Sequence, residues 1–172
     1  MAELTPQQII DHLKLEPLAQ EGGYFRRTYS SADVLPVVAL PERYGVDKLA
    51  GSAIYFLLTD AKDGFSALHR LPTDEIYHFY LGDPVELVTI SPEGDLQVTV
   101  LGQDILNGQQ VQAVAPAGWW QGSRLTAGGE YALLGTTMAP AFTEGDYEHG
   151  IPAELLVQFP QHTTLIRRFT RP

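Results

Sequence analysis

The residues best suited to chemistry lie in the stretch 64–82. His69 falls in a run of β-forming residues, and Glu75 opens a second such run after a Pro-Thr-Asp corner. Because alternate side chains of a strand share a face, Glu75 should lie on one face with Tyr77 and Phe79. An imidazole and a carboxylate on neighbouring strands can bind a metal, move a proton or anchor a polar ligand.

Glu75 is the strongest single candidate. A carboxylate in an aromatic strand is costly unless it is paired, hydrogen-bonded or protonated. The structural alternative is that Glu75 is only a partner for Arg70 or for a buried hydroxyl group. A lone histidine on an apolar strand is more often a core residue than a ligand, and the place of His69 beside Glu75 gives the functional interpretation equal weight. His78 should point away from Glu75 unless a β-bulge intervenes.

Two motifs resemble those of the cupin superfamily. Glu75 and Gly82 are separated by six residues as in the first cupin motif, although only His69 of its histidine pair is present. Pro116-Ala-Gly-Trp-Trp-Gln121 is similar to the second motif, with Gln121 where the family has histidine.

Dispersed motifs extend the resemblance over most of the chain, which is similar to the cupin subfamily DUF985 (cupin_5). They lie at 21–30, 53–58, 69–70, 74–79 and 139–142. The resemblance implies a jelly-roll fold (a double-stranded β-helix) and a homodimer, but no settled reaction.

The donor set argues against a tightly bound transition metal. His69, Glu75 and the amide of Gln121 are the aligned groups, and an amide oxygen is a weak substitute for an imidazole. We therefore expect no metal and no other cofactor, and leave open only a weakly held divalent metal at His69 and Glu75. A bulge that turned His78 inward would strengthen such a site.

Length, cysteine content and net charge limit the classes of function that are possible. A length of 172 residues predicts one domain over 1–172, and the absence of cysteine removes disulfides and thiolate chemistry. A net charge of −10 disfavours nucleic acid and anionic membranes as partners. Neither a signal peptide nor a membrane-spanning apolar run is visible, so we expect a cytoplasmic protein.

The local patterns predict an all-β protein with a short N-terminal helix. Thr5 is a suitable N-cap for a helix within 4–15, and Gln8 completes a capping box. Two glycines precede a strand from 24 to 29. Further strands are expected at 34–40, 52–59, 65–71, 85–90, 96–101, 110–115, 131–139 and 154–159, with a last helix at 165–169. The absence of helical crossovers favours a sandwich or barrel, with 85–90 and 96–101 forming a hairpin.

Aromatic and polar side chains complete the expected pocket. Arg26 and Arg27 should lie on opposite faces of their strand, so that one of them reaches the pocket mouth. The expected ligand-binding residues are Arg26, Tyr55, His69, Glu75, Tyr77, Phe79, Trp120 and Gln121. The expected ligand is a small polar or aromatic molecule.

His69 and Glu75 are the expected catalytic pair, in metal-free acid–base chemistry of the epimerase or isomerase kind. The chain also has a weaker likeness to the cofactor-free sugar-nucleotide 3,5-epimerases, at His69 and at the segment 21–25. Those enzymes have a lysine at the position of Glu75, where a carboxylate would repel the enolate, so their activity is not carried over. Two alternatives remain open: a metal-dependent oxygenase, decarboxylase or isomerase, and a ligand sensor without turnover.

Overall fold

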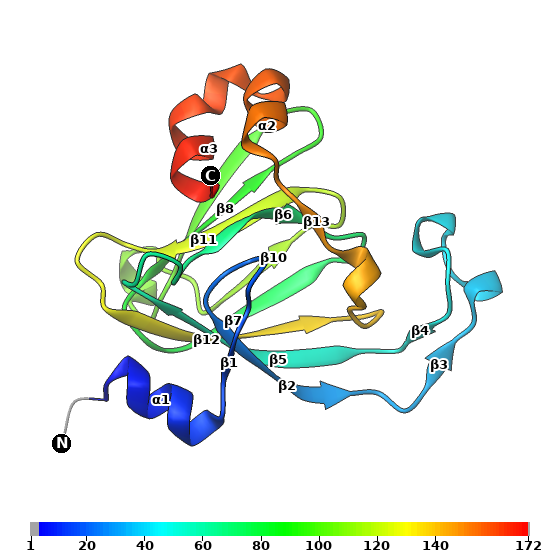
Figure 1. Ribbon diagram of the computed structural model, residues 1–172, viewed down its shortest axis with the longest axis horizontal. Helices are drawn as coiled ribbons and strands as arrows, with labels where there is room; N and C mark the ends of the chain where they lie inside the picture. Colours follow the sequence, from blue (N-terminus) through cyan, green and yellow to red (C-terminus); the bar gives the residue numbers. More distant parts are fainter. Residues whose placement is uncertain (1–3, 172) are drawn as a thin grey trace.

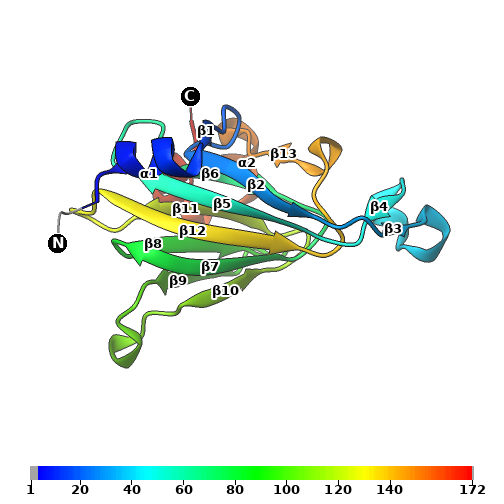
Figure 2. The ribbon, with the colours of Figure 1, turned by 90° about the horizontal axis from the view of Figure 1, so that it is seen from below.

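The computed structural model describes residues 4–171 and is mostly β. Two antiparallel sheets pack against each other (Figures 1 and 2). The first sheet has the order β1 (Glu16–Pro17), β2 (Tyr24–Ser30), β5 (Ser52–Thr59), β12 (Tyr131–Met138), β7 (Glu75–Gly82) and β10 (Gln112–Ala115). The second has the order β13 (Glu148–His149), β6 (Ser66–Arg70), β11 (Trp120–Leu125), β8 (Val85–Ile90) and β9 (Leu96–Leu101).

The N-terminal helix forms where the sequence predicts it. Helix α1 (Pro6–Leu13) begins with a capping box, in which the backbone nitrogen of Gln8 donates to Thr5 Oγ1 at 3.3 Å and Gln8 Oε1 accepts from the backbone nitrogen of Thr5 at 3.0 Å. Ile9 packs with Leu57 and Leu133 on the outer face of the first sheet. The helix therefore covers one end of that face and leaves the rest without a helical layer (Figure 2).

Residues 154–158 are helical and Phe159 caps the helix, which contradicts the predicted strand at 154–159. Helix α2 (Pro152–Gln158) starts at a proline, which suits a first helical turn. Leu155 and Phe159, four residues apart, are both buried against the second sheet. The helical period places these two side chains one turn apart on the same face, where they can fill one contact. In an extended strand they would be separated by the length of four residues, too far apart to fill it.

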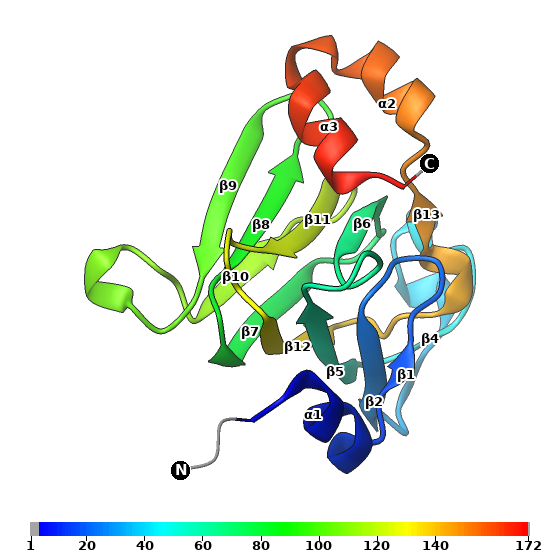
Figure 3. The ribbon, with the colours of Figure 1, turned by 60° about the vertical axis from the view of Figure 1, so that its left-hand side comes forward.

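The last helix, α3 (Thr163–Phe169), confirms the predicted C-terminal helix. It packs with α2 over the outer face of the second sheet, as Figure 3 shows. The strand side chains in this layer are Leu68, Val88, Ile90 and Trp120.

The predicted strand at 34–40 is mostly wrong. Only Val34–Leu35 is extended (β3), and it pairs with β4 (Lys48–Leu49) in an arm that projects from the body (Figure 1). Prolines at 36 and 41 interrupt the segment, because proline lacks the amide proton that a continuing strand needs. Short 3₁₀ turns take its place, η1 (Val37–Ala39) and η2 (Glu42–Tyr44).

The other strand predictions agree with the structure to within two residues at each end. The hairpin of β8 and β9 is confirmed by the pairing of Val85 with Leu101 and of Ile90 with Leu96. Three further 3₁₀ turns are η3 (Ile105–Asn107), η4 (Glu144–Asp146) and η5 (Pro160–His162). Within residues 4–171, none of the helices is long and apolar enough to cross a membrane.

The space between the sheets has an apolar end and a polar end. The apolar end contains Phe56, Leu58, Phe79, Leu87 and Leu134. Strand β7 runs from the polar end, where it begins with Glu75, toward the apolar end. The candidate site lies at the polar end.

Candidate functional site

A cavity of about 370 Å³ opens at the polar end of the space between the sheets. Its apolar walls include Leu18, Phe25, Ile54, Leu71, Met138 and Phe142. Its polar lining includes Glu21, Arg27, Glu75, Thr136, Glu144 and Tyr147. Apolar walls with a few polar groups are the usual composition of a small-molecule site, and the volume lies in the range of such sites.

Glu75 lies at the inner end of the cavity, and side chains that do not line the cavity form hydrogen bonds with its carboxyl group. It is 7 % exposed. The Gln121 amide nitrogen donates to its Oε2 at 2.9 Å, and the Tyr77 hydroxyl lies 3.4 Å from the same oxygen. Gln121 therefore positions the carboxylate from strand β11.

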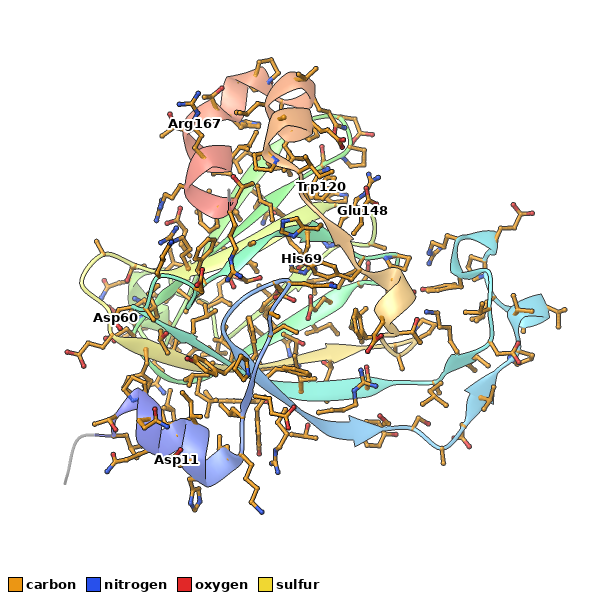
Figure 4. All side chains as sticks on the ribbon, in the orientation of Figure 1. Asp11, Asp60, His69, Trp120, Glu148 and Arg167 are labelled. Carbon is orange, nitrogen blue, oxygen red and sulfur yellow. The ribbon has the colours of Figure 1, made fainter. Side chains whose placement is uncertain are left out.

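His69 lies between two carboxylates. Its Nε2 is 4.0 Å from Glu75 Oε2 and 3.9 Å from Glu21 Oε2. Its Nδ1 is 2.8 Å from the carbonyl oxygen of Ala67, and because a carbonyl can only accept, Nδ1 carries the proton. A neutral ring therefore turns its unprotonated Nε2 toward both carboxylates. Figure 4 shows His69 inside the molecule. Its ring stacks on that of Tyr147, with the ring centres 5.2 Å apart.

Glu21 is the principal site residue that the sequence reasoning missed. It lies in the loop between β1 and β2, and its Oε1 accepts a hydrogen bond of 2.6 Å from Ser66 Oγ. Gly22 follows with φ +110°, and a Cβ at this position would lie 2.1 Å from the carbonyl oxygen of Phe65. The available signal was a carboxylate directly before two glycines, which shape the turn that carries it inward.

Burial shifts the pKa values of all three groups. It raises the pKa of Glu21 to about 7, against the lowering effects of the Ser66 hydrogen bond and the charge of Arg171. It also raises the pKa of Glu75, and the nearby Glu21 charge raises it further. Burial lowers the pKa of His69, although the Glu75 charge acts in the opposite direction. Burial therefore favours the uncharged form of all three groups, and Glu21, with a pKa of about 7, can both hold and release a proton near neutral pH, which suits proton exchange.

The structure brings some of the predicted residues together and separates others. His69, Glu75, Tyr77 and Gln121 form one cluster, but only Glu75 of these lines the cavity. His78 lies on the outer face of the first sheet, where its Nε2 is 2.8 Å from Thr137 Oγ1. This agrees with its expected orientation.

Arg26 and Tyr55 do not line the cavity, so their assignment to the pocket is wrong. Both lie on the outer face of the first sheet, with the Arg26 guanidinium 5.6 Å from the centre of the Tyr55 ring. Tyr55 also makes an edge contact with Tyr80. The inward face of β2 instead carries Phe25 and Arg27, because it is this face that meets the second sheet.

Phe79 and Trp120 are also remote from the cavity. Phe79 lies in the apolar core. Trp120 lies on the opposite side of the second sheet, under the C-terminal helices and 4.8 Å from the Arg70 guanidinium (Figure 4). Strand β11 alternates, so the inward position of Gln121 turns its neighbour Trp120 outward.

The donor groups do not fit a transition metal. Among residues 4–171, no three His, Cys, Asp or Glu side chains form a group that could hold one. Gln121 presents its amide nitrogen, a donor, to Glu75. The cluster contains one imidazole, and its neighbouring carboxyl groups have raised pKa values, which oppose the ionised form that a metal requires.

Gln121→His is expected to create metal affinity, because it would add a second imidazole beside His69 and Glu75. Calorimetric titration with Ni²⁺ or Zn²⁺ should then give at least about tenfold tighter binding than in the unchanged protein, in line with the effect of a well-placed ligand. Gln121→Asn is the matched control and should give no gain. Equal metal binding by all three proteins would contradict the proposed arrangement.

The comparisons with known proteins agree with this architecture. The chain is 32% identical to a protein of Shewanella oneidensis, with 99% of both chains covered and a TM-score of 0.85. It is 28% identical to a hypothetical protein from Leishmania major, with 98% of this chain and 100% of that chain covered and a TM-score of 0.88. No protein of curated function matches the sequence.

More distant structures share the fold alone. A cupin 2 conserved barrel domain protein from Rhodopseudomonas palustris is 14% identical, with 91% of this chain and 86% of that chain covered and a TM-score of 0.56. The sequence profile described as "Cupin superfamily (DUF985)" matches residues 7–150. The match covers most of the chain, which therefore belongs to the DUF985 family of the cupin superfamily.

Proposed function

We propose that the cavity binds a small polar or aromatic molecule and that Glu75, Glu21 and His69 exchange protons with it without a metal. One observation carries this proposal: the buried carboxyl group of Glu75 and the partly buried one of Glu21 converge at the inner end of an apolar cavity, with His69 Nε2 within 4.0 Å of each. Such an arrangement of titratable groups with shifted pKa values is typical of acid–base sites.

The two carboxyl groups can play complementary parts. An ionised Glu75 takes a proton from the ligand, and a protonated Glu21 returns one, so that no net proton is consumed. His69 is 1 % exposed and does not line the cavity, so we assign it the transfer of the proton between the two carboxyl groups. The reaction class is isomerisation or epimerisation by proton transfer.

Glu75→Gln tests binding at this site. The purified protein is denatured and the released small molecules are identified by mass spectrometry. We expect the unchanged protein to release one compound in near-stoichiometric amount and Glu75→Gln to release at least about tenfold less, because a charged hydrogen-bond acceptor is lost. Glu93→Gln, at an exposed turn, is the matched control. Equal release by both variants would argue against the site.

Turnover is tested separately with the compound identified in this way. Incubation in heavy water should introduce deuterium at the carbon that loses its proton, and His69→Gln should slow the exchange by about 10²-fold or more, as expected for a group that transfers protons. Binding without any exchange would favour a ligand sensor over an enzyme.

We also propose that the two sheets form the jelly roll of cupins and that the chain is a homodimer. The support for a dimer is the part of the outer face of the first sheet that α1 leaves uncovered, where Tyr29, Tyr80 and Val114 are each more than 40 % exposed. Light scattering at micromolar concentration should give twice the mass of 18.9 kDa. Val114→Glu should give the monomer mass, because it adds a charge to an apolar face. A monomer without the substitution would refute this proposal.

A further inference from the structure

Arg27 is an unpartnered cation in the wall of the cavity. Its side chain lines the cavity from strand β2, and it makes no hydrogen bond or ion pair with any residue in the described range. The neighbouring Arg26, by contrast, stacks over Tyr55 on the outer face of the sheet. A guanidinium is a fork of donors that matches the two oxygens of a carboxylate. Arg27 is therefore available to a ligand.

The register of the first sheet fixes how Arg27 and the inner end of the cavity are arranged. Arg27 pairs with Ile54, Ile54 pairs with Thr136, and Thr136 pairs with Tyr77 of β7. Three strand spacings of about 4.8 Å thus separate β2 from β7 by roughly 14 Å. Glu75 lies two residues before Tyr77 on β7, opposite Met138, and Ile54 and Thr136 line the cavity on the two strands between β2 and β7. The cavity volume of about 370 Å³ lies at the small end of the range for ligand sites and suits a ring-sized molecule.

The acidic groups restrict the charge of the ligand. Glu21 and Glu75 line the inner end, and Glu144 lines the cavity from η4. A second anionic group on the ligand would be repelled by these carboxylates, whereas a hydroxyl group can hydrogen-bond with them in either protonation state. Phe25 and Phe142 add aromatic surface to the walls.

We infer that the ligand is a ring-sized monocarboxylic acid whose carboxylate binds Arg27 and whose far end carries a hydroxyl group directed at Glu75 and Glu21. This inference rests on the proposed function and deepens it, because it names the chemical class that the cavity accepts. In it Arg27 determines specificity, and the two carboxyl groups act at the opposite end of the ligand.

Three probes test the class by calorimetric titration at pH 7. They are 4-hydroxybenzoate, its uncharged analogue 4-hydroxybenzamide, and the dicarboxylate terephthalate. We expect the first to bind at least about tenfold more tightly than either of the others, which is the usual effect of one charge-assisted hydrogen bond. Equal binding of the acid and the amide, tighter binding of terephthalate, or no binding of the acid at millimolar concentration would overturn the inference.

Neighbouring arginines provide the matched variants. Arg27→Gln should remove the preference for the acid over the amide, Arg27→Lys should restore part of it, and Arg26→Gln should leave it unchanged. Circular dichroism checks that each variant is folded. A preference that survives Arg27→Gln would overturn the inference. The inference can fail while the proposed function stands: if the compound released from the native protein lacks an acidic group but depends on Glu75, the inference is wrong and the proposed site stands.

Discussion

Asp146→Ala is expected to lower the free energy of unfolding by about 3–5 kcal/mol, the usual cost of breaking a buried ion pair. Lys48 is 1 % exposed, and its Nζ lies 2.5 Å and 2.6 Å from the two carboxylate oxygens of Asp146. The same Lys48 Nζ also donates to Thr143 Oγ1 at 2.7 Å. Removing the carboxylate would leave a buried ammonium group without a counter-charge, which is the source of the large loss.

Chemical denaturation at pH 7 measures this loss. The matched control is Glu148→Ala, which breaks the Arg70–Glu148 pair, whose side chains are 39 % and 52 % exposed. An exposed pair contributes about 0–1 kcal/mol, so the control should be close to the unchanged protein. The double variant Lys48→Met with Asp146→Met should recover much of the stability, because it removes both charges. Equal losses from Asp146→Ala and Glu148→Ala would contradict the expectation.

The buried pair also bears on the candidate site. Lys48 belongs to β4 in the projecting arm, and Asp146 ends the turn η4 directly before Tyr147 of the cavity wall. The pair therefore ties the arm to the segment that carries Tyr147. A ligand assay on the destabilised variant at low temperature should show weakened binding even while the protein remains folded.

The second large effect is a loss of stability as the pH rises. Burial raises the pKa of Glu21 from 4.5 to about 7. Between these two values the folded protein holds a proton that the unfolded chain has released, so the folded state loses stability across this pH window and no further above it. The shift corresponds to a free energy on the order of 3 kcal/mol at 1.36 kcal/mol per pKa unit. Glu75, whose pKa is raised for the same reason, acts in the same direction.

Glu21→Gln should remove the contribution of Glu21. The amide keeps an oxygen that can accept from Ser66, but it does not ionise. We expect the variant to match the unchanged protein near pH 4.5 and to exceed its free energy of unfolding by on the order of 3 kcal/mol at pH 8. The lowered pKa of His69 acts oppositely below pH 6.5, but it is common to both proteins and largely cancels in the difference.

The exposed substitution Glu93→Gln provides the comparison for this titration. It removes the same formal charge, so it corrects for the general effect of the net charge of −10. A difference between Glu21→Gln and the unchanged protein that stays constant from pH 4.5 to 8 would show that the Glu21 carboxyl group titrates normally.

The sequence by itself determined the local elements and the inward positions on β7 and β11. Strand alternation and turn residues are short-range properties, so the bounds of β5, β8 and β9 and the face shared by Glu75 and Tyr77 followed directly from the pattern. The cupin-like motifs placed Gln121 beside Glu75, and the structure puts their side chains 2.9 Å apart. The capping box determined the start of α1.

Only the tertiary structure decided which face of β2 is inside and which loop completes the site. Each face of β2 carries one aromatic residue and one arginine near its start, so hydrophobicity could not choose between Arg26 and Arg27. Glu21 lies 48 positions before His69, and only the packing of its loop on Phe65 and Ser66 brings the two side chains to 3.9 Å. Residues 154–158 became helical because burial of Leu155 and of the capping residue Phe159 against the second sheet outweighed their local preference. Contacts between distant segments, rather than patterns within them, therefore create the candidate site.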